Sequence, residues 1–164
     1  MGFISAAVAL FSPGGVGQWK RLTNERPSNN GDEPKSTILV IDDEPAVLLT
    51  VKTLLDKRGF KVLTSSSSPK GLDLLRYAAR DIRIVVLDYS MPKLDGGETL
   101  NYIKQLSPNA KVIGLTAMKL DSLPKEYIDG IDKLLSKPVV ATELNGAIDE
   151  LFGDEQTVAA AIEP

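Results

Sequence analysis

Two residue types that carry much of protein chemistry are missing from this sequence. Its 164 residues include no cysteine and no histidine. The first absence excludes disulfide bonds, thiolate metal sites and thiol nucleophiles. The second excludes histidine-ligated zinc, histidine-dependent catalytic triads and any phosphohistidine formed on this chain. Catalysis or binding must therefore use aspartate, glutamate, lysine, hydroxyl groups or the backbone.

A strong charge excess and a long apolar run are missing as well. Lysine and arginine total 19 against 22 aspartates and glutamates, which gives a formal net charge of −3. This balance predicts no nucleic-acid partner and no attraction to an anionic membrane. The apolar segment 3–11 is too short for a membrane span of roughly 18 residues, and no positive charge precedes it as in a signal peptide. We therefore expect a cytoplasmic protein with no membrane span.

The composition divides the chain into three parts. Residues 1–35 contain turn-rich clusters of glycine, proline, serine and asparagine, which predict a poorly ordered extension and linker. Residues 36–152 show regular apolar patterns and are expected to form one domain. Residues 153–164 are expected to form a loosely held tail. Because so few residues follow Phe152, we expect no output domain after it and hence a stand-alone module.

Strand and helix patterns alternate through the central part. Continuous apolar, β-branched runs predict strands, and apolar residues at helical spacing predict the helices between them. The expected strands are 37–41, 60–64, 82–87, 111–116 and 132–136, and the expected helices are 47–55, 68–77, 100–106, 124–129 and 142–151. This repeated alternation predicts an α/β fold, a doubly wound five-stranded parallel sheet with helices on both faces.

Polar residues follow four of the expected strands at their carboxyl ends. They are Asp42, Asp43, Glu44, Asp88, Thr116 and Lys137. Because the carboxyl ends of parallel strands lie at one edge of the sheet, where ligands bind, these side chains are expected to converge. Each residue alone has an ordinary explanation, as an N-cap of the helix that begins at Pro45, a strand-end residue or a solvated lysine.

Taken together, these residues favour a functional site. Several carboxylates at one edge repel each other and require a cation or a bound proton. Carboxylate oxygens are the ligands that Mg²⁺ prefers in proteins. A divalent cation beside a lysine and a hydroxyl group is suited to holding a phosphoryl group.

Four segments carry a resemblance to a known family. Residues 38–44, 85–96, 113–117 and 135–138 resemble, in this order and spacing, the receiver (CheY-like) domain of two-component response regulators in its single-domain form. The resemblance covers residues 36–152 and implies a flavodoxin-like fold. It implies a protein that takes a phosphoryl group from a histidine kinase or a histidine phosphotransfer protein. Such a protein signals by phosphorylation-dependent protein–protein interaction or by phosphorelay, here to a target that the sequence does not identify.

The resemblance also implies a phosphoacceptor and a metal site. Asp88 is the expected phosphoacceptor. Asp42, Asp43 and Asp88 are expected to bind Mg²⁺ together with the backbone carbonyl of Ser90. Asp43 is expected to contact the metal directly, and Asp42 partly through water.

Two further residues are implied to act with Asp88. Lys137 is expected to pair with the phosphoryl oxygens as a point charge, and Thr116 is expected to turn its hydroxyl toward the phosphate. Phosphoryl transfer of this kind depends mainly on positioning and charge neutralisation. A receiver catalyses its own phosphorylation once per chain, so it is not a turnover enzyme.

Local structure around the acceptor is implied as well. The Lys137–Pro138 peptide bond is often cis in this family. Pro92 is expected to stiffen the loop after Asp88, and Gly96 and Gly97 are expected to allow a tight turn into the next helix.

Three departures from the family pattern affect the expected switch. Leu134 stands where the family often has an aromatic residue that rotates inward on phosphorylation, which argues against a rotating ring there. Pro124 is expected to shorten the fourth helix and so to alter the partner surface. Ser90 and Met118 are neither acids nor amides that would orient an attacking water, so we predict slow self-dephosphorylation.

Two other functions compete with this interpretation. A degenerate receiver would act as a constitutive protein-binding module, but the full set of site residues argues against it. A phosphatase of the haloacid-dehalogenase type also uses an aspartate nucleophile and Mg²⁺, and the spacing of Asp42 and Glu44 mimics its motif. Pro45 and the later segments do not follow that motif. Turnover of a generic phosphomonoester would identify the hydrolase.

Overall fold

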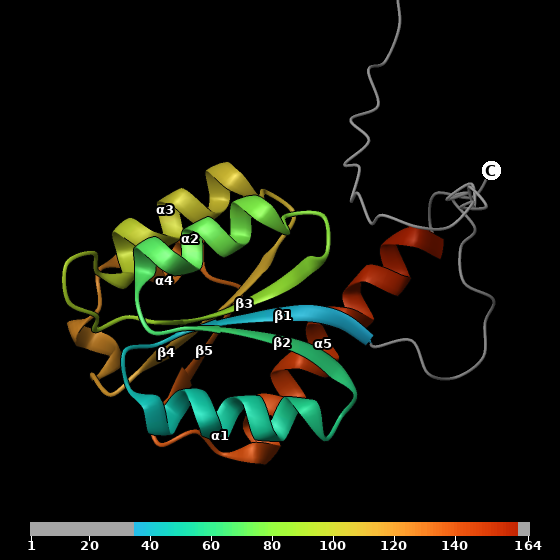
Figure 1. Ribbon diagram of the computed structural model, residues 1–164, viewed down its shortest axis with the longest axis horizontal. Coiled ribbons are helices and arrows are strands. Elements are labelled where there is room, and N and C mark those ends of the chain that lie inside the picture. The colour runs from blue at the N-terminus through green and yellow to red at the C-terminus, as the bar shows by residue number, and fades with distance from the viewer. Residues whose placement is uncertain (1–34, 161–164) are drawn as a thin grey trace, which may run out of the picture. The chain divides into compact units, whose positions relative to one another are not determined.

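The computed structural model describes residues 35–160, with side chains described from 36 to 153 (Figure 1). Segment 3–11 and the rest of the expected extension up to residue 34 lie outside this range. The strands are β1 (Lys35–Ile41), β2 (Phe60–Ser65), β3 (Ile82–Asp88), β4 (Lys111–Thr116) and β5 (Lys133–Ser136). The helices are α1 (Pro45–Asp56), α2 (Ser68–Tyr77), α3 (Gly96–Leu106), α4 (Lys125–Gly130) and α5 (Ala141–Ala160), with a 3₁₀ turn η1 (Leu120–Ser122). The expected alternation of strands and helices is confirmed.

The strands form one parallel sheet in the order β2-β1-β3-β4-β5. This order confirms the doubly wound, flavodoxin-like fold. The strand order reverses at β1, and ligands of such sheets bind outside the carboxyl ends of the strands at this point. Ile41 of β1 pairs with Leu87 of β3. The next residues along the chain, Asp42 and Asp88, are therefore level with each other on neighbouring strands.

Helices cover both faces of the sheet. Figure 1 shows α2, α3 and α4 on one face and α1 and α5 on the other. The side chains of β1 alternate between two cores, with Leu39 and Ile41 in one and Ile38 and Val40 in the other, because successive strand residues point to opposite faces. All four are fully buried, and burial of each contributes about 1.5–3 kcal/mol. This packing fixes the strands and the polar residues at their ends.

Local signals in the sequence start the helices. α1 and α2 have Pro45 and Pro69 in their first turns, where a missing N–H is no loss. Asp95 caps α3, because its side chain accepts a hydrogen bond from the N–H of Glu98 at 2.9 Å. Pro124 is the N-cap of α4, which has only 6 residues. The expected short fourth helix is confirmed.

The last helix is longer than the sequence predicted. α5 continues to Ala160 rather than ending at Leu151. A glycine inside a helix costs only about 1 kcal/mol relative to alanine, so Gly153 does not stop α5, and helix-forming residues follow it. The expected tail 153–164 therefore begins as helix. Across residues 35–160, no helix combines the length and the apolar character needed to cross a membrane.

Gly96 allows the tight turn into α3 by close packing rather than by a left-handed backbone. The positive φ in this loop belongs to Lys93, at 77°, and not to Gly96 or Gly97. Gly96 is the first residue of α3, and a Cβ at this position would lie 2.6 Å from the Cα of Tyr89. Gly96 is therefore needed for the close approach of α3 to the end of β3, rather than for a left-handed turn.

Candidate functional site

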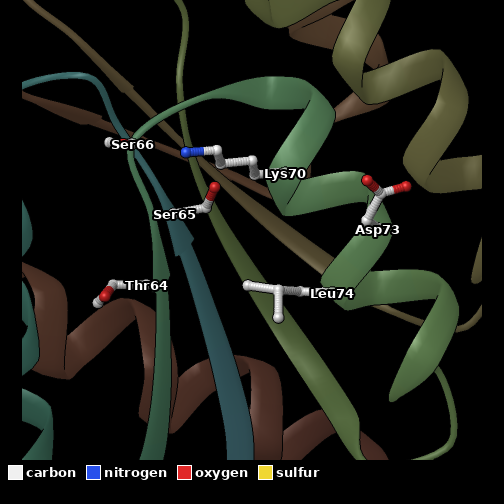
Figure 2. A pocket seen from close by; sticks show the side chains of 6 residues that line it. All are labelled: Thr64, Ser65, Ser66, Lys70, Asp73 and Leu74. Carbon is white, nitrogen blue, oxygen red and sulfur yellow. The ribbon is translucent and has the colours of Figure 1, made fainter.

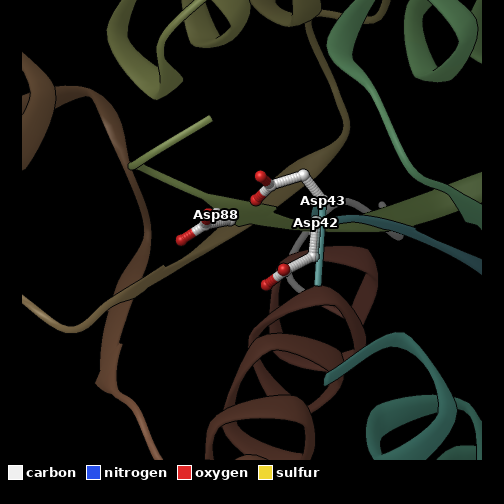
Figure 3. A group of neighbouring side chains, drawn as sticks. All are labelled: Asp42, Asp43 and Asp88. Carbon is white, nitrogen blue, oxygen red and sulfur yellow. The ribbon is translucent and has the colours of Figure 1, made fainter. Parts of the chain in front are cut away.

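Three carboxylates meet at the carboxyl ends of β1 and β3. Asp42 and Asp43 directly follow β1, and Asp88 is the last residue of β3. One carboxylate oxygen of each lies within 4.8 Å of the others, and Figure 3 shows the three side chains on one side of the strand ends. Asp42 and Asp88 are 0% and 1% exposed, whereas Asp43 is exposed. The expected convergence of these acids is confirmed.

Lys137 brings a cation to two of these acids and to Glu44. Its ammonium lies 2.9 Å from Asp42 Oδ2, 3.1 Å from Asp88 Oδ1 and 2.7 Å from Glu44 Oε1. The contact with Glu44 is also an aligned hydrogen bond, which Lys137 donates. Asp42 Oδ2 and Asp88 Oδ1 are buried, yet neither accepts a hydrogen bond from the residues that the structure describes. The ammonium therefore forms close ion pairs with both buried oxygens, although only its contact with Glu44 is an aligned hydrogen bond.

Burial and ion pairing oppose each other in this group. Burial raises the pKa of Asp42, whereas Lys137 and the N–H of Glu44 lower it, and Asp88 adds to the increase. Burial lowers the pKa of Lys137, but its bonds to Glu44, Asp42 and Asp88 outweigh burial and raise that pKa overall. The lysine is therefore a stable cation at neutral pH. Three acidic side chains contact this one ammonium, and Asp43 adds a fourth acid to the cluster.

The residues at this edge fit a divalent cation. The donors are carboxylate oxygens, which hard cations such as Mg²⁺ prefer. Asp42 Oδ2 and Asp88 Oδ1 accept no aligned hydrogen bond from the described residues, and both share one ammonium, that of Lys137. A divalent cation would satisfy both oxygens and offset the excess of acids.

The other expected site residues lie at or beside the same edge. Thr116 ends β4 and is buried, and its Oγ1 accepts a hydrogen bond from the N–H of Met118 at 2.9 Å. The carbonyl of Thr116 accepts a hydrogen bond from the N–H of Lys137 at 2.7 Å, which ties the lysine to β4. Ser90 is exposed in the loop after β3, and its role as a metal ligand stays a prediction. The Lys137–Pro138 peptide bond is cis.

A buried polar chain supports the loop after Asp88. The hydroxyls of Ser68 in α2 and Thr99 in α3 lie 2.8 Å apart, and Ser68 donates to the carbonyl of Leu94 at 3.2 Å. Both hydroxyl residues are fully buried. The N–H of Gly96 donates to the carbonyl of Tyr89 at 2.9 Å. Sequence reasoning missed this support, because single hydroxyl residues on two separate helices form no motif.

An aromatic pair lies next to Asp88. Tyr127 of α4 is buried, and its ring centroid lies 4.7 Å from that of Tyr89. The Tyr127 hydroxyl has no hydrogen-bond partner among residues 36–153. Burial raises the pKa of Tyr127, and Asp88 raises it further. Leu134 packs against the same core, so the aromatic side chain here comes from α4 rather than from β5.

A separate pocket of about 510 Å³ lies around the end of β2 and the start of α2 (Figure 2). It is lined by Thr64, Ser65, Ser66, Lys70, Asp73 and Leu74. The Ser65 hydroxyl donates to the carbonyl of Ser67 at 2.8 Å, and Asp73 pairs with Arg76. None of the clustered acids lines this pocket, so it is distinct from the acidic site.

A family model identifies the class of protein that this fold and site define. The model described as the response regulator receiver domain matches residues 38–149. The chain belongs to this family. Its members are the receiver domains of two-component systems, which receive phosphoryl groups from histidine kinases.

Individual proteins show the same relationship. The chain is 36% identical over 118 residues to the transcriptional regulatory protein CpxR homolog of Haemophilus influenzae, covering 71% of this chain and 50% of that protein. It is 32% identical over 129 residues to the transcriptional regulatory protein GlrR of Escherichia coli K12, covering 77% of this chain and 28% of that protein. The chain thus spans half or less of these curated relatives. A solved response regulator receiver domain protein from Clostridium thermocellum is 38% identical with a TM-score of 0.70, covering 76% of this chain and 99% of that one.

Proposed function

We propose that this chain accepts a phosphoryl group on Asp88 and signals through the change in protein interactions that follows. The observation that carries the proposal is the arrangement at the sheet edge. Three carboxylates converge within 4.8 Å, and the Lys137 ammonium lies 3.1 Å from Asp88. A carboxylate in this setting can act as a nucleophile, with a cation beside it for the oxygens of the incoming group.

The proposed reaction moves a phosphoryl group from a donor phosphohistidine to Asp88. A carboxylate oxygen of Asp88 attacks phosphorus, so that a P–O bond forms and the P–N bond breaks. The leaving imidazole keeps the electron pair of that bond and takes up a proton. Positioning and charge neutralisation are the main requirements of such a transfer. Lys137 pairs with the phosphoryl oxygens, and Thr116 turns its hydroxyl toward them.

Mg²⁺ is the cofactor that the acidic residues fit. Asp43 would hold it directly, Asp42 partly through water, and Asp88 and the carbonyl of Ser90 would complete the protein ligands. When bound, the ion supplies positive charge next to the phosphoryl oxygens. The buried, unsatisfied oxygens of Asp42 and Asp88 support this assignment.

The proposed partners follow from the family. The donor is a histidine kinase or a histidine phosphotransfer protein, and the product is either bound by a target or passed on in a phosphorelay. A change of a two-state equilibrium from 1:99 to 99:1 requires about 5.5 kcal/mol of differential stabilisation, and a phosphoryl group beside Lys137 is the source we propose for it. The stand-alone form, the cytoplasmic location and slow self-dephosphorylation stay predictions.

Intact-protein mass spectrometry tests the proposal. Wild-type and Asp88→Asn chains are incubated with Mg²⁺ and acetyl phosphate, with and without a chelator. We expect one added phosphoryl group on the wild type, none on the variant and none with the chelator. A wild-type chain that binds neither Mg²⁺ nor a phosphoryl group would favour a degenerate receiver that acts as a constitutive binding module.

A further inference from the structure

Glu44 has no part in the proposed reaction, yet it makes the shortest contact of Lys137. Its Oε1 accepts a hydrogen bond from the lysine ammonium at 2.7 Å. The ammonium lies farther from the buried oxygens, at 2.9 Å from Asp42 and 3.1 Å from Asp88, and these oxygens accept no hydrogen bond from the described part of the chain. The one aligned donor of Lys137 in this cluster therefore points to Glu44.

The exposed fractions of the side chains show that the contact with Glu44 directs the Lys137 ammonium toward the surface. The Glu44 side chain is 60% exposed, whereas the Lys137 side chain is 10% exposed. Asp42 and Asp88 are buried. Lys137 is thus held between two buried carboxylates and one carboxylate at the surface, and its aligned hydrogen bond is the one to the surface.

Capping of α1 does not account for the Glu44 carboxylate. Glu44 is the N-cap residue of α1, but its side chain makes no capping hydrogen bond. The Glu44 N–H itself donates to Asp42 Oδ1 at 2.9 Å. The N–H groups of Val47 and Leu48 in the first turn donate to the backbone carbonyl of Glu44 instead. The contact of the Glu44 side chain with Lys137 therefore needs another explanation.

We infer that Glu44 is a positioning residue that retains Lys137 in the resting state and so slows phosphorylation of Asp88. This inference rests on the proposed function. An ammonium has three donors, and here three carboxylates lie 2.7, 2.9 and 3.1 Å from it. To pair with a phosphoryl group arriving at Asp88, the ammonium must exchange the Glu44 carboxylate for phosphoryl oxygens. Removal of that carboxylate frees one donor in advance.

Glu44→Gln tests this role through the rate of phosphorylation. An exposed ion pair contributes up to about 1 kcal/mol, and 1.36 kcal/mol is a factor of ten in rate. We therefore expect Glu44→Gln to accelerate phosphorylation about two- to fivefold. The rate is measured by intact mass at saturating Mg²⁺, so that a change in metal affinity does not enter.

Two phosphoryl donors of different charge distinguish retention of Lys137 by Glu44 from simple repulsion of the phosphoryl donor by Glu44. Near neutral pH acetyl phosphate is a dianion, whereas phosphoramidate carries about one net negative charge. If Glu44 acts by retaining Lys137, the variant gains by the same factor with both donors. If Glu44 only repels anions, the gain is larger with acetyl phosphate, and the inference is overturned.

Two further variants complete the test. Glu150→Gln removes an exposed glutamate that pairs with Lys133 at the start of β5, the end opposite Lys137, and should leave the rate unchanged. In a Lys137→Ala background, Glu44→Gln should no longer accelerate the reaction. An acceleration that persists there, or equal rates for the wild type and Glu44→Gln, would overturn the inference alone. Absence of any adduct on either chain would overturn the proposed function together with it.

Discussion

Removal of one oxygen atom from Tyr127 is expected to stabilise this protein. The Tyr127 side chain is 2% exposed, and its hydroxyl has no hydrogen-bond partner among the described residues. A buried hydroxyl without a partner costs about 1–3 kcal/mol. Tyr127→Phe removes that cost and keeps the ring next to Tyr89. Because the lost oxygen leaves a small void, we expect a gain of about 1 kcal/mol in the free energy of unfolding.

Gly114 on β4 provides a second test of where this hydroxyl lies. A Cβ at Gly114 would lie 2.7 Å from the Tyr127 hydroxyl oxygen and 3.0 Å from Ile131 Cδ1. Overpacking of this kind costs about 1–3 kcal/mol, so Gly114→Ala should destabilise the wild type. The same change should cost less in the Tyr127→Phe background, because the nearest atom is gone. A double-mutant cycle should give a coupling energy of about 1 kcal/mol.

Urea unfolding followed by circular dichroism measures these differences. For a domain of this size, a gain of 1 kcal/mol corresponds to a rise in melting temperature of about 4 °C. Tyr77→Phe is the matched control, since Tyr77 is 95% exposed, and it should change stability by less than about 0.5 kcal/mol. A loss of 1 kcal/mol or more in Tyr127→Phe would show that the hydroxyl has a partner, and it would refute the reasoning.

Two further perturbations test the electrostatics of a half-buried acid, Asp132, and of a buried acid, Asp42. Burial raises the pKa of Asp132, but the N–H of Val112 and the ammonium groups of Lys111 and Lys104 outweigh it and lower that pKa below 3.8. This stabilisation is present above the unfolded pKa and is lost as pH falls through the folded pKa. Asp132→Asn should therefore lower the free energy of unfolding by about 1–2 kcal/mol at pH 7 and should not change it in strong acid. Urea titrations at each pH measure this difference. Burial raises the pKa of Asp42 above 3.8, because the folded protein disfavours the ionised form. The wild type therefore loses stability as Asp42 ionises with rising pH. In chelator at pH 7, Asp42→Asn should therefore be more stable than the wild type, by a margin that shrinks in acid. Added Mg²⁺ should stabilise the wild type more than the variant. Lower stability of that variant in chelator would contradict this account of Asp42.

Much of the fold and the acidic cluster could be predicted because the relevant signals are local. The strand 82–88 is buried on both faces and therefore reads as an almost unbroken apolar run. Strand–helix alternation requires parallel strands, and these bring their carboxyl ends to one edge. The positions of Asp42 and Asp88 directly after apolar runs were then enough to predict that their carboxylates meet.

Other features depend on packing between distant residues, which no local pattern encodes. Lys137 and Glu44 are 93 residues apart, and which acid the ammonium prefers is set by burial and side-chain geometry. Tyr127 lies in a helix of 6 residues, which is too short to show a period, and so its burial against Tyr89 was not anticipated. The end of α5 at Ala160 was missed because residues 153–164 were expected to form a loosely held terminal tail.

The identity of the phosphorylated residue is the most direct test of the proposed function. Wild-type protein is treated with acetyl phosphate and Mg²⁺ and then with borohydride, which reduces an aspartyl phosphate to homoserine, and the modified peptide is sequenced by mass spectrometry. We expect modification at Asp88 alone, and none in chelator. Modification at Asp42 or Asp43 instead, or none at all on a protein that binds Mg²⁺, would contradict the assignment of Asp88 as the phosphoacceptor.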